Sequence, residues 1–303
     1  MNAHSIGLAA AQITSRGGEA KVMGVTSRGV FLSIEQRVLF VSFERWRGPL
    51  TINVDEVFDC AIGEAVRMSA ARLVFPTIEI DLSAAEVWQS TPSAIARPIA
   101  DQREALKQLA SSVLARKEPE GFGPLLPHLL DLPEKQALSA SEAALLARLK
   151  QLRESIHQQA LDQTTTLIES LLGLGRGLTP SGDDVTIGLL LMLTHVKGKH
   201  PEQSGGRPST SLRSAQDAPA AQSKDALVAV KHRVVESAYQ RTTTISANLI
   251  ECAANGEADE RLINVIDGLV TGTPSRDDCV ECVIGWGNSS GLDALIGMAL
   301  AAA

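Results

Sequence analysis

The spacing of apolar residues along the chain changes character near residue 90. Before that point, runs rich in β-branched and aromatic residues are separated by polar turns, and the first two runs have the spacing of a hairpin. A short helix is expected before Gly17-Gly18. These features predict a β-rich lobe over residues 1–90. Its expected strands lie within 30–34, 38–43, 50–54, 72–75 and 77–82.

Beyond about residue 92 the apolar positions recur at helical spacing. We expect helices over 140–172, 183–196 and 225–254, followed by three shorter ones. The stretch 201–224 is rich in Ser, Gly, Pro and Ala and has almost no large apolar residue, which predicts a mobile loop. The expected fold class is α+β, with an N-terminal β-rich lobe followed by a larger, mostly helical domain over residues 91–303.

One short segment of the helical region recurs. Residues 179–184 read Thr-Pro-Ser-Gly-Asp-Asp, residues 273–278 read Thr-Pro-Ser-Arg-Asp-Asp, and residues 290–293 form a weaker copy, Ser-Gly-Leu-Asp. We interpret each copy as a helix start, with Ser as the cap and Asp at the positive end of the helix dipole. In the first and third copies Ile-Gly follows at the same offset, at 187–188 and 296–297, which suggests close helix packing. The sequence leaves open whether the three starts converge.

Composition limits the class of protein. The 303 residues are 44% apolar and 21% charged, as in an ordinary globular chain, and only 3% aromatic, which favours packed helices in the core. A formal net charge of −7 lacks the basic footprint of a nucleic-acid-binding protein. With no signal-peptide pattern and no apolar run long enough for a membrane span, a cytoplasmic protein is expected. Cys279-x-x-Cys282 lacks a second pair of metal ligands.

The best candidate for a functional site is segment 173–184, Gly-Leu-Gly-Arg-Gly-Leu-Thr-Pro-Ser-Gly-Asp-Asp. Four glycines and a proline so close together predict unusual backbone angles or close approach to a ligand. The free N–H groups of the following helix would attract an anion, and Arg176 would add a forked cation. The alternative is a tight connector between two helices. The segment is neither a Walker loop, since no Gly-Lys-Ser/Thr follows, nor a dinucleotide fingerprint, since a helix precedes it.

Polar residues of three segments are candidates for one site. Asp183 and Asp184 could act as a base, as acceptors for substrate N–H groups or as metal ligands, or could only compensate the helix dipole. We favour Asp184, since Asp293 holds the matching place in the third copy. Ser181, Asp183 and Asp184 are the candidates for catalysis, with no metal ligand assigned. The candidates for binding substrate or anion are Gly175, Arg176, Gly177, Thr179, Gly182, Arg241, Thr242, Ser246, Ser289, Ser290 and Gly291.

Three segments together resemble the AllH-like family. They are 173–184, Arg-Thr-Thr-Thr-Ile-Ser-Ala at 241–247 and Ser-Ser-Gly-Leu-Asp-Ala-Leu-Ile-Gly at 289–297, and the resemblance extends to 48–53 in the β-rich lobe. The named member of this family is a subunit of oxamate carbamoyltransferase, from anaerobic allantoin breakdown. The resemblance implies the conversion of oxalurate and phosphate to oxamate and carbamoyl phosphate, or its reverse. It also implies two partners, an FdrA-like chain and an AllG-like chain.

Carbamoyl transfer requires an amide nitrogen held against a carbamoyl carbon, and a stabilised leaving phosphate. We expect Asp184 and the hydroxyls of Thr179, Ser181 and Ser290 to meet the first need, and the loop amides with Arg176 to meet the second. No cofactor is assigned, although Mg²⁺ is possible. Two other functions stay open: a non-catalytic subunit that scaffolds or binds a small anion, and a stand-alone enzyme acting on another small carboxylate or amide.

Overall fold

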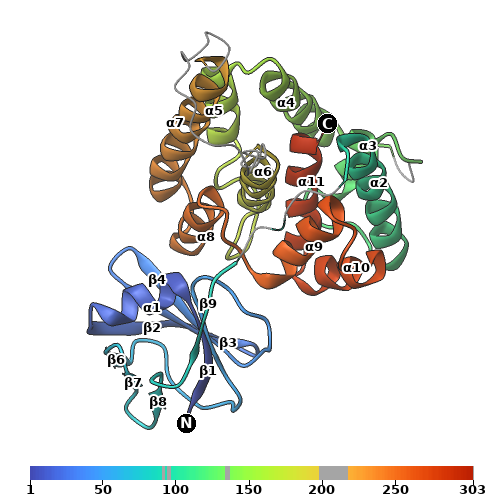
Figure 1. Ribbon diagram of the computed structural model, residues 1–303. Helices are drawn as coiled ribbons and strands as arrows, with labels where there is room; N and C mark the ends of the chain where they lie inside the picture. The colour runs from blue at the N-terminus through green and yellow to red at the C-terminus, as the bar shows by residue number, and fades with distance from the viewer. Residues whose placement is uncertain (91–92, 94–96, 134–136, 198–217, 303) are drawn as a thin grey trace, which may run out of the picture. The chain divides into compact units, whose positions relative to one another are not determined.

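The protein consists of two compact units. The computed structural model describes residues 1–90, 93, 97–133, 137–197 and 218–302. The first unit, here the sheet unit, comprises Met1–Pro92 and Gly256–Val265, and the second, the helical unit, comprises Ser93–Asn255 and Ile266–Ala303. The predicted α+β class is confirmed, because a nine-stranded sheet precedes a mostly helical region (Figure 1).

A single curled sheet forms most of the sheet unit, in the order β8-β7-β6-β2-β3-β4-β5-β1-β9. Neighbouring strands are antiparallel except for the parallel pairs β4–β5 and β1–β9. A bridge between Asn2 and Asp81 links the segment before β1 to β8, so that the sheet curls back on itself. The strands are β1 (Ala3–Gly7), β2 (Gly18–Thr26), β3 (Gly29–Ile34), β4 (Arg37–Ser42), β5 (Thr51–Val54), β6 (Ala65–Met68), β7 (Arg72–Val74), β8 (Glu79–Asp81) and β9 (Glu86–Trp88).

Alternation of apolar and polar residues places one face of the sheet in a common core. In β2, for example, Ala20 and Val22 are buried while Glu19 and Lys21 are exposed. Helix α1 (Leu8–Ser15) packs on the same core through Ala10, as the helix expected before Gly17-Gly18. The five expected strands correspond to β3, β4, β5, β7 and β8 and are confirmed, whereas β1, β2, β6 and β9 were not foreseen.

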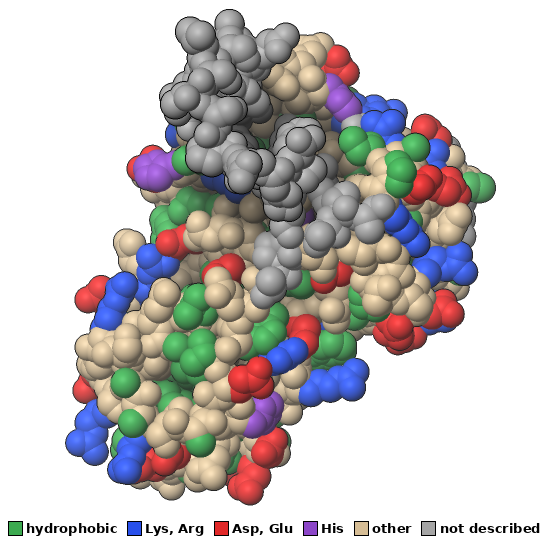
Figure 2. All heavy atoms as spheres, viewed as in Figure 1, with side chains coloured by type: hydrophobic (Ala, Val, Ile, Leu, Met, Phe, Trp, Pro, Cys, Tyr) green, Lys and Arg blue, Asp and Glu red, His purple; other side chains and the backbone are tan. Residues whose placement is uncertain are grey.

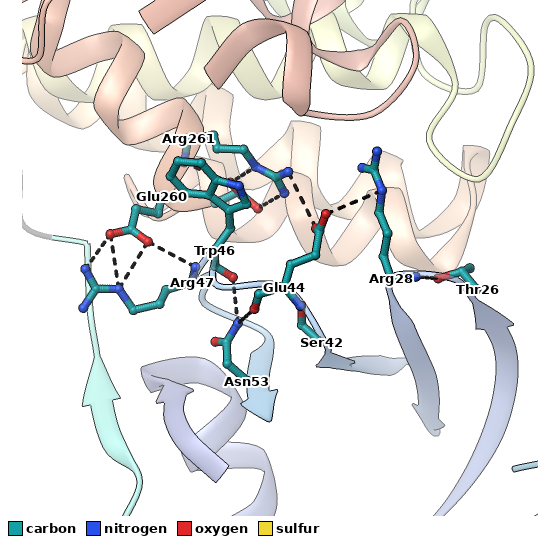
Figure 3. A network of polar contacts seen from close by, with 10 residues as sticks. Thr26, Arg28, Ser42, Glu44, Trp46, Arg47, Asn53, Glu260 and Arg261 are labelled. Atoms are coloured by element: carbon teal, nitrogen blue, oxygen red, sulfur yellow. Dashed lines mark hydrogen bonds and ion pairs between the residues drawn. The ribbon is translucent and has the colours of Figure 1, made fainter. Parts of the chain in front are cut away.

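Residues 256–265, here called the strap, belong to the sheet unit despite their distance in sequence. Figure 3 shows the contacts that hold them there. The Arg47 guanidinium donates hydrogen bonds to the Glu260 carboxylate at 2.5 and 3.2 Å, and the Glu260 N–H donates to the Arg47 carbonyl at 2.8 Å. Arg261 lies 3.7 Å from the Glu44 carboxylate. Paired, partly buried charges therefore fix the strap.

The helical unit is built around two central helices. Helices α6 and α11 are buried along most of their length and pack against each other (Figure 1). The helix expected over residues 183–196 is confirmed as α6. No described helix combines the length and apolar character that a membrane span needs. The elements are α2 (Ile99–Arg116), η1 (Gly123–Leu125), α3 (Leu126–Leu130), α4 (Ala140–His157), α5 (Leu161–Glu169), α6 (Ser181–Lys197), α7 (Ala218–Arg241), α8 (Thr244–Ala254), α9 (Glu260–Val270), which begins in the strap, α10 (Arg276–Gly285) and α11 (Ser290–Ala302).

Two of the expected helices are each divided in two. The expected helix 140–172 is α4 followed by α5, because Gln159 takes a left-handed conformation with φ of 54°. The expected helix 225–254 is α7 followed by α8. Its break falls among the threonines, where the Thr243 hydroxyl caps α8 by accepting a hydrogen bond from the Ser246 N–H at 3.1 Å.

The loop expected over 201–224 is only partly described. Residues 201–217 lie outside the described residues. Residues 218–224 form the first turns of α7, so that this part of the prediction is wrong. Alanine has the highest helix propensity, and Pro219 is tolerated because the first turn of a helix does not need its N–H.

Candidate functional site

The first two turns of α6 and α11 carry copies of one sequence, separated by 109 positions (181 to 290). A side chain at Gly188 would place its Cβ 2.0 Å from the carbonyl oxygen of Ala294, and one at Gly297 would place it 2.0 Å from that of Val185. Ala294 and Val185 are related by the same shift of 109 positions, so the two contacts are equivalent. The helices therefore cross about a local two-fold axis, and the close packing expected from the repeated Ile-Gly is confirmed.

Polar side chains are exchanged across the same axis. The Ser181 hydroxyl, at the start of α6, faces the Asp293 carboxyl of α11 and opposes the increase that burial causes in its pKa. The Ser290 hydroxyl, at the start of α11, faces the Asp184 carboxyl of α6 and opposes the same effect of burial on its pKa. Ser181 corresponds to Ser290 in the repeat, and Asp184 to Asp293. The first and third copies of the repeat therefore converge on one place.

The second copy does not join them. The Ser275 hydroxyl caps α10 by accepting from the Asp278 N–H at 3.3 Å, and Asp278 is exposed. Arg276 stands where the other copies have glycine. Those glycines are needed, because a Cβ at Gly182 would lie 2.0 Å from the carbonyl oxygen of Leu171. A Cβ at Gly291 would lie 1.9 Å from the carbonyl oxygen of Val283. The cap role expected for serine is thus confirmed at Ser275, whereas the serines that start α6 and α11 face carboxyl groups.

Asp184 is a fully buried carboxyl group without a hydrogen-bond partner. Its exposed fraction is 0%, and neither oxygen accepts a hydrogen bond from any described residue. The hydroxyls of Thr179 and Ser290 approach it closely enough to oppose the increase in its pKa, and one of them donates to the other at 3.3 Å. Burial, and then repulsion by Asp293 and Asp183, raises the pKa of Asp184 well above its usual value. Burial therefore shifts Asp184 towards its protonated form.

Asp293 is buried to the same degree but has one partner. Its Oδ1 accepts a hydrogen bond from the Phe122 N–H at 2.7 Å, and its Oδ2 has no partner among the described residues. Burial raises the pKa of Asp293 to about 6, although the hydroxyls of Ser181 and Ser289 oppose the shift. A Cβ at Gly121, where φ is +60°, would lie 2.6 Å from Asp293 Oδ2. The backbone at residue 121 thus lies directly over this carboxyl group.

Asp183 has a different environment from its neighbour. Its Oδ1 accepts from the Gly173 N–H at 2.8 Å, and its Oδ2 accepts from the Thr242 hydroxyl. The Ser246 hydroxyl also faces it, and these contacts oppose the increase that burial causes in its pKa. Asp183 therefore joins the start of the glycine-rich loop and the α7–α8 junction to the first turn of α6.

The glycine-rich loop adopts the unusual backbone that its composition predicts. Gly173, Gly175 and Gly177 have φ angles of 74°, 123° and 101°. A Cβ at Gly175 would lie 2.7 Å from the Ser181 backbone nitrogen. The turn itself accounts for these glycines, as the connector interpretation supposed. The case for a ligand consequently depends on the unpartnered carboxyl groups at the base of the loop.

Arg176 and Arg241, the two cations among the candidates, are exposed, whereas the carboxyl groups of the site are buried. Arg176 is exposed on the loop. Arg241 is exposed and donates a hydrogen bond to the Glu169 carbonyl at 3.3 Å. The candidates that the structure gathers around Asp184 and Asp293 are Thr179, Ser181, Ser289 and Ser290, with Thr242 and Ser246 at Asp183. Gly182 and Gly291 instead pack against the backbone of Leu171 and Val283.

Sequence reasoning missed the segment that covers Asp293. Gly121 and Phe122 lie in the stretch Pro119-Glu120-Gly121-Phe122-Gly123-Pro124. Its glycines and prolines mark a turn. Nothing in the local pattern indicates which part of the fold that turn contacts.

The three buried carboxyl groups differ from the charged surface, because no described cation acts on them. On the face that Figure 2 shows, acidic and basic side chains are interspersed. By contrast, no Lys, Arg or His among the described residues shifts the pKa of Asp183, Asp184 or Asp293. Among the described residues, no group of three or more His, Cys, Asp or Glu side chains is arranged to hold a metal ion. The possible Mg²⁺ stays a prediction.

Removing the Asp183 carboxylate should destabilise the helical unit. In Asp183→Ala the Gly173 N–H and the Thr242 hydroxyl lose their acceptor, and we expect the free energy of unfolding to fall by about 2 kcal/mol. Urea unfolding followed by circular dichroism measures this. Asp277→Ala is the control, because Asp277 also lies in the first turn of a helix but is exposed, and the expected change is below about 0.5 kcal/mol. Equal effects of the two variants would contradict the role given to Asp183.

The fold is that of an α+β protein in which buried carboxyl groups meet between the starts of two helices. Residues 171–302, from the glycine-rich loop to the end of α11, match the family model of oxamate carbamoyltransferase subunit AllH. Over these residues the chain is similar to the AllH family, and the match contains the three motifs of the resemblance. The family is that of a subunit of oxamate carbamoyltransferase, in allantoin catabolism, and a subunit implies partner subunits. No solved structure matches the chain.

Proposed function

We propose that this chain is a subunit of an oxamate carbamoyltransferase and contributes the place where the carbamoyl-bearing substrate binds. The family supports the activity, and the observation that carries the site is Asp184, a fully buried carboxyl group whose two oxygens have no hydrogen-bond partner among the described residues. An unsatisfied buried polar group costs about 1–3 kcal/mol, and such groups occur where a ligand or proton completes them. The proposed partners are an FdrA-like and an AllG-like chain.

The reaction divides the substrate between two environments. Oxalurate and phosphate give oxamate and carbamoyl phosphate, so a ureide end rich in N–H groups must lie beside an anionic phosphate. The carboxyl cluster suits the N–H groups, and it repels phosphate. The exposed loop, with its backbone N–H groups and Arg176, suits the phosphate.

Reconstitution tests the proposal. The chain is combined with its two partner chains, and carbamoyl transfer between oxamate and carbamoyl phosphate is measured with and without it. Transfer should require this chain, and Asp184→Ala should lower the rate by about a hundredfold or more, in the range found when one group that stabilises the transition state is removed. The matched control is Asp277→Ala, and size-exclusion chromatography verifies that each variant assembles.

The outcomes separate the alternatives. Full activity without this chain would eliminate the proposed subunit role. Normal activity of Asp184→Ala in an assembled complex would leave the chain as a scaffold and eliminate the site. Transfer by the purified chain alone would favour a stand-alone enzyme.

A further inference from the structure

We infer that Asp293 is a further specificity-determining residue, which pairs with Asp184 to recognise a primary amide. Asp184 donates a hydrogen bond to the amide oxygen, and Asp293 accepts one from the amide N–H. The inference rests on the proposed function in one respect: the proposed reaction identifies the primary amide as the carbamoyl end of the substrate.

Asp184 and Asp293 are related by the local two-fold axis between α6 and α11. Asp184 and Asp293 occupy equivalent positions on α6 and α11, and each faces the serine that starts the other helix. Both side chains are fully buried, and three of their four oxygens have no partner among the described residues: both of Asp184 and the Oδ2 of Asp293. Such a concentration of unsatisfied oxygens is costly unless a ligand supplies partners.

The exposed backbone at Gly121 lies against the Asp293 carboxyl. Gly121 is exposed, and a Cβ at this position would be 2.6 Å from Asp293 Oδ2 and 2.7 Å from Ser181 Oγ. The backbone at residue 121 therefore separates the Asp293 carboxyl from the surface without a side chain between them.

The charges around the pair permit one shared proton. Asp183 is the one further carboxyl whose charge acts on Asp184, and no cation among the described residues shifts either pKa. The other packed segments present backbone N–H groups and hydroxyls, at Phe122, Thr179 and Ser289. The ionisable residues of these segments, Glu120, Arg176 and Arg241, are exposed. Besides burial, the negative charge of Asp293 raises the pKa of Asp184, so the two carboxyl groups do not ionise independently and the pair keeps one proton near neutral pH.

The proton belongs mainly to Asp184. Burial and like charge raise the pKa of Asp184 well above its usual value. The hydrogen bond from the Phe122 N–H, by contrast, stabilises the ionised form of Asp293. Near neutral pH the pair thus presents one O–H donor, on Asp184, and one negatively charged acceptor, on Asp293.

A primary amide is the complement of that arrangement. Its carbonyl oxygen accepts the Asp184 hydrogen bond, and its NH₂ group donates to Asp293 Oδ2. A carboxylate or phosphate ligand offers acceptors without donors and is repelled. An ammonium group offers donors without an acceptor for the Asp184 O–H. The pair therefore selects the carbamoyl end of a substrate.

Two ligands that differ in one group provide the test. Oxamate carries a primary amide, and pyruvate has a methyl group in place of its NH₂. Calorimetric titration of the full-length chain, near neutral pH, should show oxamate binding at least about tenfold more tightly than pyruvate, because pyruvate leaves the Asp293 acceptor unpaired. Equal affinities, or no oxamate binding, would overturn the inference.

Asparagine variants separate the two roles. Asp184→Asn keeps a donor and no charge, so it should retain oxamate affinity to within about threefold and lose the weakening at alkaline pH that deprotonation of the pair causes in the native chain. Asp293→Asn loses the charged acceptor and should weaken oxamate binding about tenfold or more. Asp278→Asn is the matched control from the exposed copy of the repeat and should change nothing.

Assay of the reconstituted complex separates this inference from the proposed function. If the complex transfers carbamoyl groups but the two asparagine variants bind oxamate alike, amide recognition by the pair is wrong and the proposed function stands. If oxamate binding follows the expected order but no transfer occurs, the proposed function is wrong and the amide site stands.

Discussion

Asp293→Asn should make the folded chain more stable at about pH 8, by on the order of 3 kcal/mol. In the native chain, burial raises the pKa of Asp293 from 3.8 to about 6. Because the folded pKa exceeds the unfolded one, the unfolded chain releases this proton first. Stability is therefore complete below about pH 4, falls as the pH rises towards about 6, and stays reduced above that. Asparagine has no proton to lose, so the variant escapes the loss.

Urea unfolding at several pH values, followed by circular dichroism, measures the effect. Asp293→Asn should match the native chain at about pH 4 and exceed it at about pH 8, since its advantage grows only where native Asp293 ionises. Asp278→Asn, in the exposed copy of the repeat, should follow the native chain throughout. A variant less stable than the native chain at about pH 8 would contradict the environment described for Asp293. Together with weaker oxamate binding, the expected gain would mark a group kept for function at the expense of stability.

Gly188→Ala should destabilise the helical unit by about 3 kcal/mol or more, above the usual range for overpacked cores because its neighbour is backbone. The added Cβ would lie 2.0 Å from the Ala294 carbonyl oxygen, so that α6 and α11 must separate. Gly297→Ala places an equivalent atom 2.0 Å from the Val185 carbonyl and should have a similar effect.

Thermal and urea unfolding of these variants, compared with Gly285→Ala, tests the crossing. Gly285 ends α10, and an added Cβ there meets nothing within 4 Å. Its replacement should change stability by less than about 1 kcal/mol, and in the favourable direction, because alanine is the better helix former. If Gly188→Ala behaved like Gly285→Ala, the helices would not be in the close contact described.

Much of the helical unit could be predicted from local pattern. The apolar run from Val185 to Leu193, interrupted only by Thr186 and Gly188, indicates a buried core helix, and the repeated glycines at 188 and 297 indicate close helix contact. The breaks near Gln159 and Thr243 were missed, because a single left-handed residue or a capping hydroxyl ends a helix without changing its apolar period. Local composition carries little information about such breaks.

The sequence predicted most residues of the candidate site, but not which segment each aspartate contacts. Successive helical positions differ by about 100°, so Asp183 and Asp184 point to different neighbours. Asp183 faces the loop start at Gly173, while Asp184 faces Ser290 of α11. Which aspartate faces which segment depends on how helices pack, and so does the contact of Gly121 with Asp293 across the chain. The sequence contains the residues but not these distances.

The strap affects how the chain can fold and how it can be divided. Because residues 256–265 belong to the sheet unit, the backbone passes between the units at 92/93, 255/256 and 265/266. A fragment that ends at residue 92 lacks Glu260 and Arg261, the partners of Arg47 and Glu44. During synthesis the sheet unit is likewise incomplete until the strap has left the ribosome, after most of the helical unit. The sheet unit is therefore complete only when its strap has been synthesised, and a cut between the units in sequence does not yield two whole domains.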